Sequence, residues 1–313
     1  MVRMGHKESQ KQDTSVLQAC QVQVQFRQPP AELRRYFTTF YFVELAAAPG
    51  ATLVDQLHPE WANLRFCSGA CPSAVSAFGG QVSGTSFAAT GPSSRAVEFT
   101  VGATRMWGIG LLPLGWAKFV GVAADSLADA VIDGHTHPAF ASFASLAASI
   151  YGGAPDEEAE FARIAAWFMA RAHEPVADEA RITAIHAALI DTEVSTVAEL
   201  VDRAGVGQRT LERVCRKAFG FAPKLLLRRQ RFMRSLAQYM LDPSLKWIGA
   251  IDGSYHDQAQ FVRDFRQFMG MTPRQYAALD HPIIGAIMME RAHHTGAAVQ
   301  TLDGPEGGGR LRT

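Results

Sequence analysis

The spacing of apolar residues divides the chain into a strand-like first half and a helical second half. Between residues 25 and 150, short apolar runs rich in aromatic and β-branched residues alternate with breakers such as Pro49-Gly50 and Gly79-Gly80. Runs of this length between turn residues are typical of β-strands. We expect strands at 36–43, 63–67, 74–78, 96–101 and 107–112, which would form a small sandwich or barrel, and short helices at 114–120 and 126–131.

From residue 155 onward the apolar positions recur with helical spacing. A helix is expected to begin at Pro155, because proline and the acidic residues after it suit the first turn of a helix. Phe161 and Phe168 belong to its apolar stripe. A second helix is expected over 178–190, and the pattern then predicts helices up to Leu279.

Residues 208–224 and 258–274 are related by an internal repeat, fifty positions apart. The identical pairs are Gln208 and Gln258, Arg213 and Arg263, Arg216 and Arg266, Gly220 and Gly270, and Pro223 and Pro273. Similarity at a fixed offset indicates that one three-dimensional unit is used twice.

Each copy has the pattern of a helix-turn-helix. In the first copy, Thr196 can cap a helix that runs to about residue 203, and Gly205 supplies the left-handed backbone that closes a helix. A second helix is expected over 208–219. The second copy has a first helix at 247–252, a turn one residue longer, and a second helix that ends at Met269.

The second helix of each copy combines an apolar inner stripe with a polar, arginine-rich outer face. Arginine matches the acceptors of guanine, and glutamine can pair with adenine. We predict DNA contacts from Gln208, Arg209, Glu212, Arg213, Arg216 and Lys217 in the first copy, and from Gln258, Gln260, Val262, Arg263 and Arg266 in the second. The alternative is an amphipathic bundle whose basic faces only meet water, but the repetition of arginine at matching positions favours DNA.

A single long helix is expected between the copies, at 224–241. Such a helix would fix the two units relative to each other, and recognition helices about 34 Å apart enter successive major grooves on one face of DNA. The basic residues expected to contact phosphates, which orient a protein without reading sequence, are Lys217, Lys224, Arg228, Arg229 and Lys246.

Composition and charge add a second argument for a polyanionic partner. The chain has 313 residues, of which 48% are hydrophobic and 19% charged, as in folded globular proteins. Thirty basic residues balance thirty acidic ones, yet residues 1–194 carry a net charge of −6 and residues 195–280 a net charge of +6. A basic domain beside an acidic one suggests that the basic one binds a polyanion, although a solvated charged face would give the same count.

Several classes of protein are not expected. The sequence has no run of about 18 apolar residues, so a membrane-spanning helix is not expected, and the polar first 14 residues argue against a secretory signal. Four cysteines are too few for a disulfide scaffold. The expected location is the cytoplasm.

The segments 204–213, 219–223 and 257–273 resemble the DNA-binding domain of AraC/XylS-type transcriptional regulators. The resemblance implies a seven-helix, double helix-turn-helix module that binds double-stranded promoter DNA in bacteria, with RNA polymerase as a further partner. By position, it implies base contacts from Arg209, Glu212 and Arg213 and from Gln258, Gln260, Val262 and Arg263. No catalytic residue follows from it, and an enzyme is not expected.

Three positions depart from this family. Gly207 stands where the family usually has serine or another capping residue, so the first recognition helix is expected to be less firmly capped. Val201 stands at a position that is usually alanine, which would widen that helix crossing. Ser254-Tyr255 replaces a common Gly-Phe pair, and serine adopts a positive φ less readily than glycine, so the second turn should be built differently.

The N-terminal part resembles a β-rich regulatory domain found in some of these regulators, through residues 30–33, 58–61 and 110–116. That resemblance implies a cupin-like half-barrel that senses a small molecule or mediates assembly, for example into a homodimer. The expected fold class is therefore α+β. The expected divisions are a flexible tail (1–24), a β-rich sensor or assembly domain (25–152), a helical connector (153–192), the DNA-binding domain (193–280) and a mostly flexible extension (281–313).

Candidate metal and nucleophile motifs are few. His135 and His137 could share a metal ion, but no third ligand stands at a recognisable spacing, and a surface turn fits better. Cys67 and Cys71 lack a second pair for zinc, and Cys215 falls on an inner stripe. No phosphate-binding loop or Gly-x-Ser-x-Gly elbow occurs, so no cofactor is expected.

Two rival interpretations remain. The first is an enzyme domain at residues 25–150 that the helical part targets to DNA. The second is an architectural DNA binder without an effector, which a filled N-terminal core would favour. Five aromatic residues bear on this choice, because they could line a pocket but are more often core: Trp61, Phe66, Phe99, Trp107 and Trp116.

Overall fold

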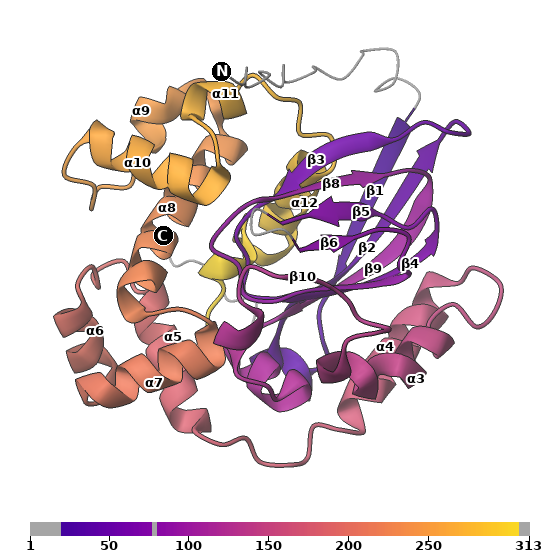
Figure 1. Cartoon of the computed structure of the whole chain (residues 1–313), viewed down its shortest axis with the longest axis horizontal. Helices are drawn as coiled ribbons and strands as arrows, with labels where there is room; N and C mark the ends of the chain where they lie inside the picture. Colours follow the sequence, from indigo (N-terminus) through magenta and orange to yellow (C-terminus); the bar gives the residue numbers. More distant parts are fainter. Residues whose placement is uncertain (1–19, 77–79, 307–313) are drawn as a thin grey trace, which may run out of the picture.

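The computed structural model describes residues 20–76 and 80–306, and in these the chain forms a β-rich half followed by a helical half (Figure 1). This order of elements confirms the α+β prediction. The expected tail falls mostly on residues 1–19, which lie outside the described residues.

The β-rich half contains two antiparallel sheets. The strands are β1 (Cys20–Arg27), β2 (Phe37–Ala47), β3 (Leu53–Leu57), β4 (Asn63–Gly69), β5 (Ser73–Val75), β6 (Gln81–Val82), β7 (Phe87–Thr90), β8 (Val97–Val101), β9 (Thr104–Leu111) and β10 (Val131–Asp133). The first sheet has six strands in the order β1-β2-β9-β4-β7-β10, and the second has four in the order β3-β8-β5-β6.

Aromatic side chains fill the core of the larger sheet. Trp107 on the central strand β9 stands opposite Phe42 on β2 and Phe66 on β4. All three are buried, and the Trp107 indole donates a hydrogen bond to Glu160 at 2.8 Å. The interpretation of these aromatics as core is confirmed for Trp61, Phe66, Trp107 and Trp116, each about 1% exposed or less, whereas Phe99 is 9% exposed and lines a cavity.

Some strands escaped the sequence analysis. Residues 20–24, which were expected in the tail, belong to β1, whose alternation of glutamine with valine places one polar face in solvent. The helix expected at 126–131 is instead a short 3-10 turn, Ala124–Leu127, followed by β10. Strand β10 forms because Val131 and Ile132 pair with β7, a long-range contact without a local signal.

The helices of the second half follow their expected positions closely. After the short helix α2 (Pro113–Gly115), which continues into a π-helical turn at Trp116–Val120, come α3 (Ala144–Ser149), α4 (Glu157–Met169), α5 (Glu179–Ile190), α6 (Val197–Ala204), α7 (Gln208–Phe219), α8 (Pro223–Leu241), α9 (Lys246–Ala250), α10 (Gln258–Met269), α11 (Pro273–Tyr276) and α12 (Ile284–Thr295). Helices α6–α7 and α9–α10 form the two expected units, and α8 runs between them (Figure 1).

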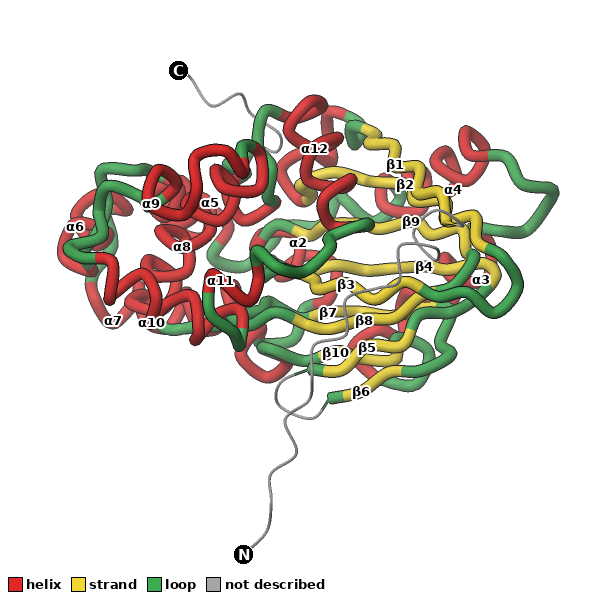
Figure 2. Tube along the Cα trace, turned by 90° about the horizontal axis from the view of Figure 1, so that it is seen from above, coloured by secondary structure: helices red, strands yellow, loops and turns green. Residues whose placement is uncertain are grey.

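The prediction of a mostly flexible extension after residue 280 is wrong for residues 281–306. Helix α12 packs beside β1 at the edge of the larger sheet (Figure 2). The Asp55 carboxylate accepts hydrogen bonds from the backbone N–H groups of Ile283 and Ile284, at 2.9 and 2.8 Å, at the start of this helix. Arg291 is buried against Thr39 and Asp303. The order of this segment comes from these contacts with the β-rich half.

The helical half packs directly against the β-rich half through α8 and α11. The side chain of Arg229 on α8 is fully buried, donates to the carbonyl of Ser93 at 2.9 Å and lies over the Trp61 ring at 4.2 Å. Farther along, His58 and the Tyr276 hydroxyl share a hydrogen bond of 2.6 Å. The two halves therefore hold each other in a defined arrangement. Among the described residues, none of the helices combines the length and the apolar character needed to cross a membrane.

Two buried histidines predict acid sensitivity. Burial lowers the pKa of His58 and that of His186 to about 3, whereas both titrate near pH 6.5 in the unfolded chain. Since the unfolded state binds more protons between these values, the free energy of unfolding should fall as the pH drops from about 6.5 toward 3. Urea unfolding at a series of pH values measures this slope.

His186→Phe should flatten part of that slope, because phenylalanine keeps the ring packing against Trp61 and Phe219 without titrating. The exposed His256 supplies the control, and His256→Gln should leave the slope as in the natural chain. An unchanged slope in His186→Phe would contradict the assignment of part of the acid sensitivity to His186.

Candidate DNA-binding surface

The first unit begins with a firmly capped helix. The Thr196 hydroxyl accepts a hydrogen bond from the Glu199 backbone, and the Glu199 carboxylate accepts from the Thr196 backbone, which is a capping box at the start of α6. The helix ends at Gly205, whose φ of 63° lies in the left-handed region that glycine adopts easily. Helix α7 starts after Gly207, which gives no side-chain cap, as the departure from the family predicted.

Helix α7 presents two distinct faces. Leu211, Val214, Cys215 and Ala218 are buried, and burial raises the pKa of the Cys215 thiol to about 12, which fits a core residue. The opposite face is exposed. Gly220 ends the helix with a φ of 82° and lies against Pro92 of the β-rich half.

The second unit uses a different turn. The Asp252 carboxylate accepts hydrogen bonds from both the backbone N–H and the hydroxyl of Ser254, so that neither Gly253 nor Ser254 needs a positive φ. Asp257 then caps α10 by accepting from the backbone N–H of Gln260 at 2.6 Å. This turn differs from that of the first unit, where Gly205 has a positive φ.

The structure leaves the predicted contact residues largely open to solvent. Every predicted residue on α7 is exposed, namely Gln208, Arg209, Glu212, Arg213, Arg216 and Lys217, as are Gln258, Arg263 and Arg266 on α10. Gln260 and Val262 are half-buried, and the Gln260 amide oxygen accepts from the His256 backbone at 3.3 Å.

The two units border one groove of about 400 Å³. Val194, Ser195 and Val197 line it on the side of the first unit, and Ser254 and Gln260 on the side of the second. Apart from Leu227, the α8 side chains along it are basic: Lys224, Arg228, Arg231 and Arg234. Both units therefore share the basic side of α8.

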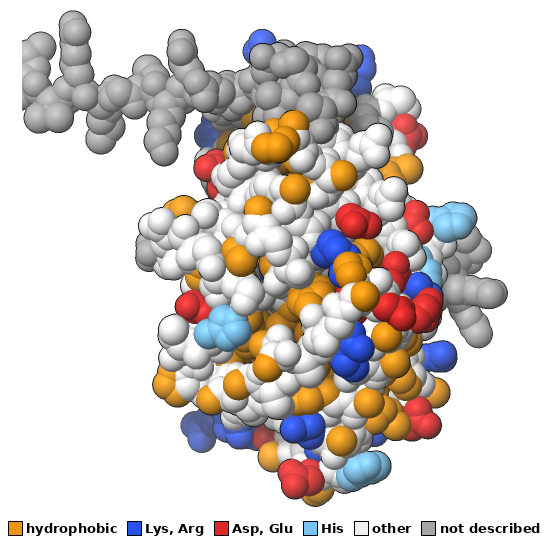
Figure 3. Space-filling view, turned by 90° about the vertical axis from the view of Figure 1, so that its right-hand side faces the viewer, with side chains coloured by type: hydrophobic (Ala, Val, Ile, Leu, Met, Phe, Trp, Pro, Cys, Tyr) orange, Lys and Arg blue, Asp and Glu red, His pale blue; other side chains and the backbone are white. Residues whose placement is uncertain are grey.

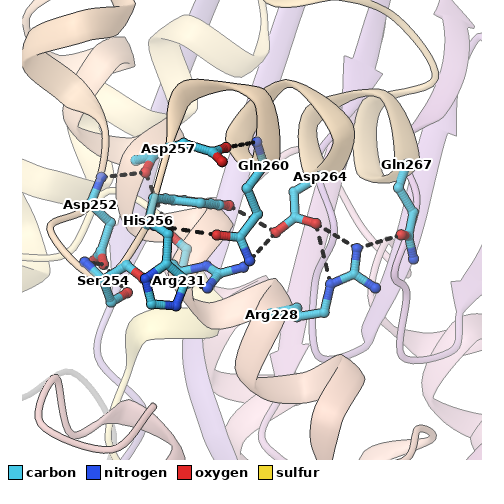
Figure 4. A network of polar contacts seen from close by, with 11 residues as sticks. Arg228, Arg231, Asp252, Ser254, His256, Asp257, Gln260, Asp264 and Gln267 are labelled. Atoms are coloured by element: carbon cyan, nitrogen blue, oxygen red, sulfur yellow. Dashed lines mark hydrogen bonds and ion pairs between the residues drawn. The ribbon is translucent and has the colours of Figure 1, made fainter. Parts of the chain in front are cut away.

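A buried carboxylate organises this groove (Figure 4). Asp264 on α10 is 1% exposed, and its carboxylate binds Arg228 at 2.5 Å and Arg231 at 2.9 Å. The Tyr255 hydroxyl donates to the same carboxylate at 3.1 Å. Nearby, Arg234 of α8 pairs with Asp252 of the second turn at 2.5 Å. These ion pairs fix α10 and its turn on α8.

The network corrects the expected phosphate contacts. Arg229 is fully buried and cannot reach DNA in this arrangement, because the β-rich half covers that face of α8. Arg228 is held by Asp264 and by the Gln267 side chain. Lys217, Lys224 and Lys246 are exposed and stay predicted phosphate contacts.

The histidine and cysteine candidates serve local structure. His135 pairs with the Ser86 hydroxyl at 2.9 Å, and His137 accepts from the backbone N–H of Ala139 at 3.2 Å. Cys67 is buried. In the described part of the chain, no three histidine, cysteine or acidic side chains lie close enough to hold a metal ion.

The side of the molecule away from the two units has a different surface. There, acidic and basic side chains are interspersed with apolar ones and form no continuous basic area (Figure 3).

Comparison with known proteins agrees with the geometry of this surface. Residues 200–278 match a family model described as a helix-turn-helix domain. These residues include α7, α8 and α10, and the match confirms that the helical part carries a DNA-binding domain of AraC type. The match supports a DNA-binding transcription regulator. A search of curated protein sequences gave no match.

Solved structures of ToxT from Vibrio cholerae resemble the chain weakly. An apo variant has 8% identity over 82% of this chain and 96% of its own, with a TM-score of 0.39. ToxT of strain O395 has 8% identity over 83% and 97%, with a TM-score of 0.37. A form bound to an unsaturated fatty acid has 9% identity over 82% and 94%, with a TM-score of 0.36. At this level, nothing about a ligand or a DNA site follows for this chain.

The Asp264 network predicts that the second unit depends on one carboxylate. Asp264→Asn should lower the free energy of unfolding by about 1–3 kcal/mol, because it leaves Arg228 and Arg231 without their carboxylate. Urea unfolding measures this loss. Asp257→Asn is the matched control on the same helix, because it removes one charge while asparagine still caps a helix. Equal stability of the two variants would contradict the role of the Asp264 carboxylate in stabilising the second unit.

Proposed function

We propose that the chain is a sequence-specific transcription regulator that reads bases with α7 and α10 and responds to a small molecule bound in its β-rich half. The observation that carries the first part is the repeat itself. Two copies of one helix-turn-helix expose arginines at matching positions, and both border the basic side of α8. Arg213 and Arg263 are the residues proposed to read guanine.

The proposal assigns a role to each part of the chain. Residues 25–152 would form the sensor or assembly domain, 153–192 the connector and 193–280 the DNA-binding domain. Residues 281–306 join the sensor, since α12 packs on β1 and is capped by Asp55 of β3. A ligand would act by shifting the population of arrangements in which both units reach DNA.

Two neighbouring cavities in the β-rich half support a small-molecule effector. One, of about 60 Å³, is lined almost entirely by apolar side chains of both sheets, including Val43, Ala74 and Phe99. The other, of about 80 Å³, is lined both by polar residues such as Thr38 and Glu60 and by apolar ones such as Met288. Ile287 of α12 lines both cavities. A ligand larger than these volumes would have to move α12.

Further partners belong to the same proposal. Control of a promoter brings the bound chain beside RNA polymerase. A second copy of the chain, bound at an adjacent site, would extend the contact with DNA. No described contact identifies the surface for either partner.

Base reading by the two arginines predicts local losses of specificity. Arg213→Ala and Arg263→Ala should each lower affinity for a preferred duplex by about 5- to 150-fold, because a bidentate contact to guanine is lost. Each should also relax discrimination at one base pair. The duplex is selected from a random pool with the full chain, and fluorescence anisotropy measures affinity.

Arg171→Ala removes an exposed arginine beyond the end of α4 and serves as the control. Equal weakening on preferred and scrambled duplexes would assign the arginine to the DNA backbone instead. For the natural chain, affinity should also fall steeply as salt rises, since phosphate contacts release counterions.

If the β-rich half binds an effector, the effector should be a small compound that fits the apolar cavity. Small apolar compounds should include some that raise the melting temperature of the full chain. Ala74→Leu should abolish that rise, because the added methyl groups occupy the cavity, and should leave DNA affinity without ligand unchanged. The absence of any stabilising compound, or an equal rise in Ala74→Leu, would favour the effector-independent DNA binder.

A further inference from the structure

Arg213, proposed above to read a base, is held by a residue outside the helix-turn-helix. Its Nη1 lies 2.8 Å from an oxygen of Asp178, the residue immediately before α5. The Arg213 side chain is 50% exposed, whereas that of Asp178 is 16% exposed. A connector residue thus reaches the outer face of the first recognition helix.

Asp178 is itself fixed in place. Its second carboxylate oxygen binds Arg181 at 2.5 Å, and its backbone has a φ of 60°, a left-handed conformation that aspartate tolerates. Hydrogen bonds from Arg213 and then Arg181 lower the pKa of Asp178 to about 2, so the carboxylate stays charged at neutral pH. It therefore offers Arg213 an acceptor whose position is fixed by the connector.

The contact occupies one corner of the guanidinium and leaves the rest open. Among the described residues, only Asp178 is hydrogen-bonded or ion-paired with Arg213, and it contacts Nη1 alone. Nε and Nη2 form the adjacent edge of the planar fork, and two neighbouring donors match O6 and N7 of guanine. Arg213 can keep Asp178 and take a base at the same time.

Holding an arginine in one conformation favours binding. A free arginine loses much rotamer freedom when it docks, and a side chain that is already oriented loses less. The carboxylate would therefore favour a contact that needs one orientation, such as the pairing with guanine. A contact with the DNA backbone, which accepts many orientations, would gain little.

We propose that Asp178 is a positioning residue that orients Arg213 for base recognition, an inference that rests on the base-reading role proposed above. Asp178 also lines a crevice of about 140 Å³ in which Val122 of the β-rich half, Val176 of the connector and Lys217 of α7 meet. Movement of the connector would therefore change how the first unit reads DNA.

A double-mutant cycle with the full chain tests this. Asp178→Asn keeps a residue that tolerates the left-handed backbone but weakens the ion pair. On the selected duplex it should lower affinity about two- to tenfold, with a smaller change on a scrambled duplex. In the Arg213→Ala background it should have no further effect, because its action runs through Arg213. Arg181→Ala should give a smaller loss of the same sign.

Asp191→Asn is the matched control, because it removes one acidic charge after the end of α5, where Asp191 pairs with Arg203. It should alter affinity equally for both duplexes. Thermal unfolding of each variant shows that the fold is retained.

The outcomes separate the two proposals. A rise in affinity in Asp178→Asn would show that Asp178 competes with DNA for Arg213 and would overturn the inference. An equal loss in the Arg213→Ala background would overturn it as well, by showing a structural role. If Arg213→Ala lowers affinity and Asp178→Asn does not, only the positioning role fails. If Arg213→Ala itself has no effect, the base-reading role fails and the inference fails with it.

Discussion

The arrangement of the second helix-turn-helix unit depends on how the charge of α8 is compensated. Four arginines of this helix lie within one stretch of seven residues, and three of them pair with carboxylates. Arg228 and Arg231 bind Asp264, and Arg234 binds Asp252. Because both carboxylates belong to the second unit, the basic side of α8 holds that unit in place. The arginines of α8 thus mainly hold the second unit in position, and the proposed contacts with DNA are left to the recognition helices α7 and α10.

The remaining arginine of the four marks the junction between the halves. Arg229 is buried with carbonyl oxygens and the Trp61 ring, and burial lowers the pKa of its guanidinium to about 9. Its Nε and Nη2, together with the buried Nε2 of His186, have no hydrogen-bond partner within the described part of the chain. Buried polar groups without partners cost free energy. The unpaired nitrogens therefore offset part of the free energy that the contacts of Arg229 contribute to this junction.

The sequence predicted what local patterns determine and missed what depends on distant contacts. Helices α7 and α10 follow from apolar stripes and capping residues, and their exposed faces agree with the structure. The same periodicity placed Arg229 on an outer face, because a helical pattern does not tell which face a separate domain will cover. Residues 296–306 looked too polar to fold, yet their order comes from contacts such as that between Gln300 and Glu60.

The residues that position the site were the hardest to recognise. Asp178 stands 35 positions before Arg213, and Asp264 stands 36 positions after Arg228. No spacing rule connects acids and arginines at such distances. Asp178 appeared in the sequence only as the start of a helix. A signal for Asp264 was present in the repeat, since this charged residue occupies an inner position that is apolar in the first copy.

The repeat explains why the two units need different supports. Asp264 occupies the position that corresponds to Val214 of the first unit. Val214 lies in the core, and only residues 220–222 separate α7 from α8, so the chain itself restrains the first unit. The corresponding helix of the second unit, α10, follows α8 only after residues 242–257, which include α9, and a side-chain clamp holds it on α8 together with packing between Phe232 and Phe265. For the arginines on the outer faces of the recognition helices, the supports are reversed: the first unit has the side-chain partner. Arg213 is held by the connector, whereas no carboxylate in the described residues pairs with Arg263. The rest of the chain thus contacts the outer arginine of the first unit, whereas the second unit is fixed through Asp264 and Asp252 and its Arg263 has no such partner in the described residues.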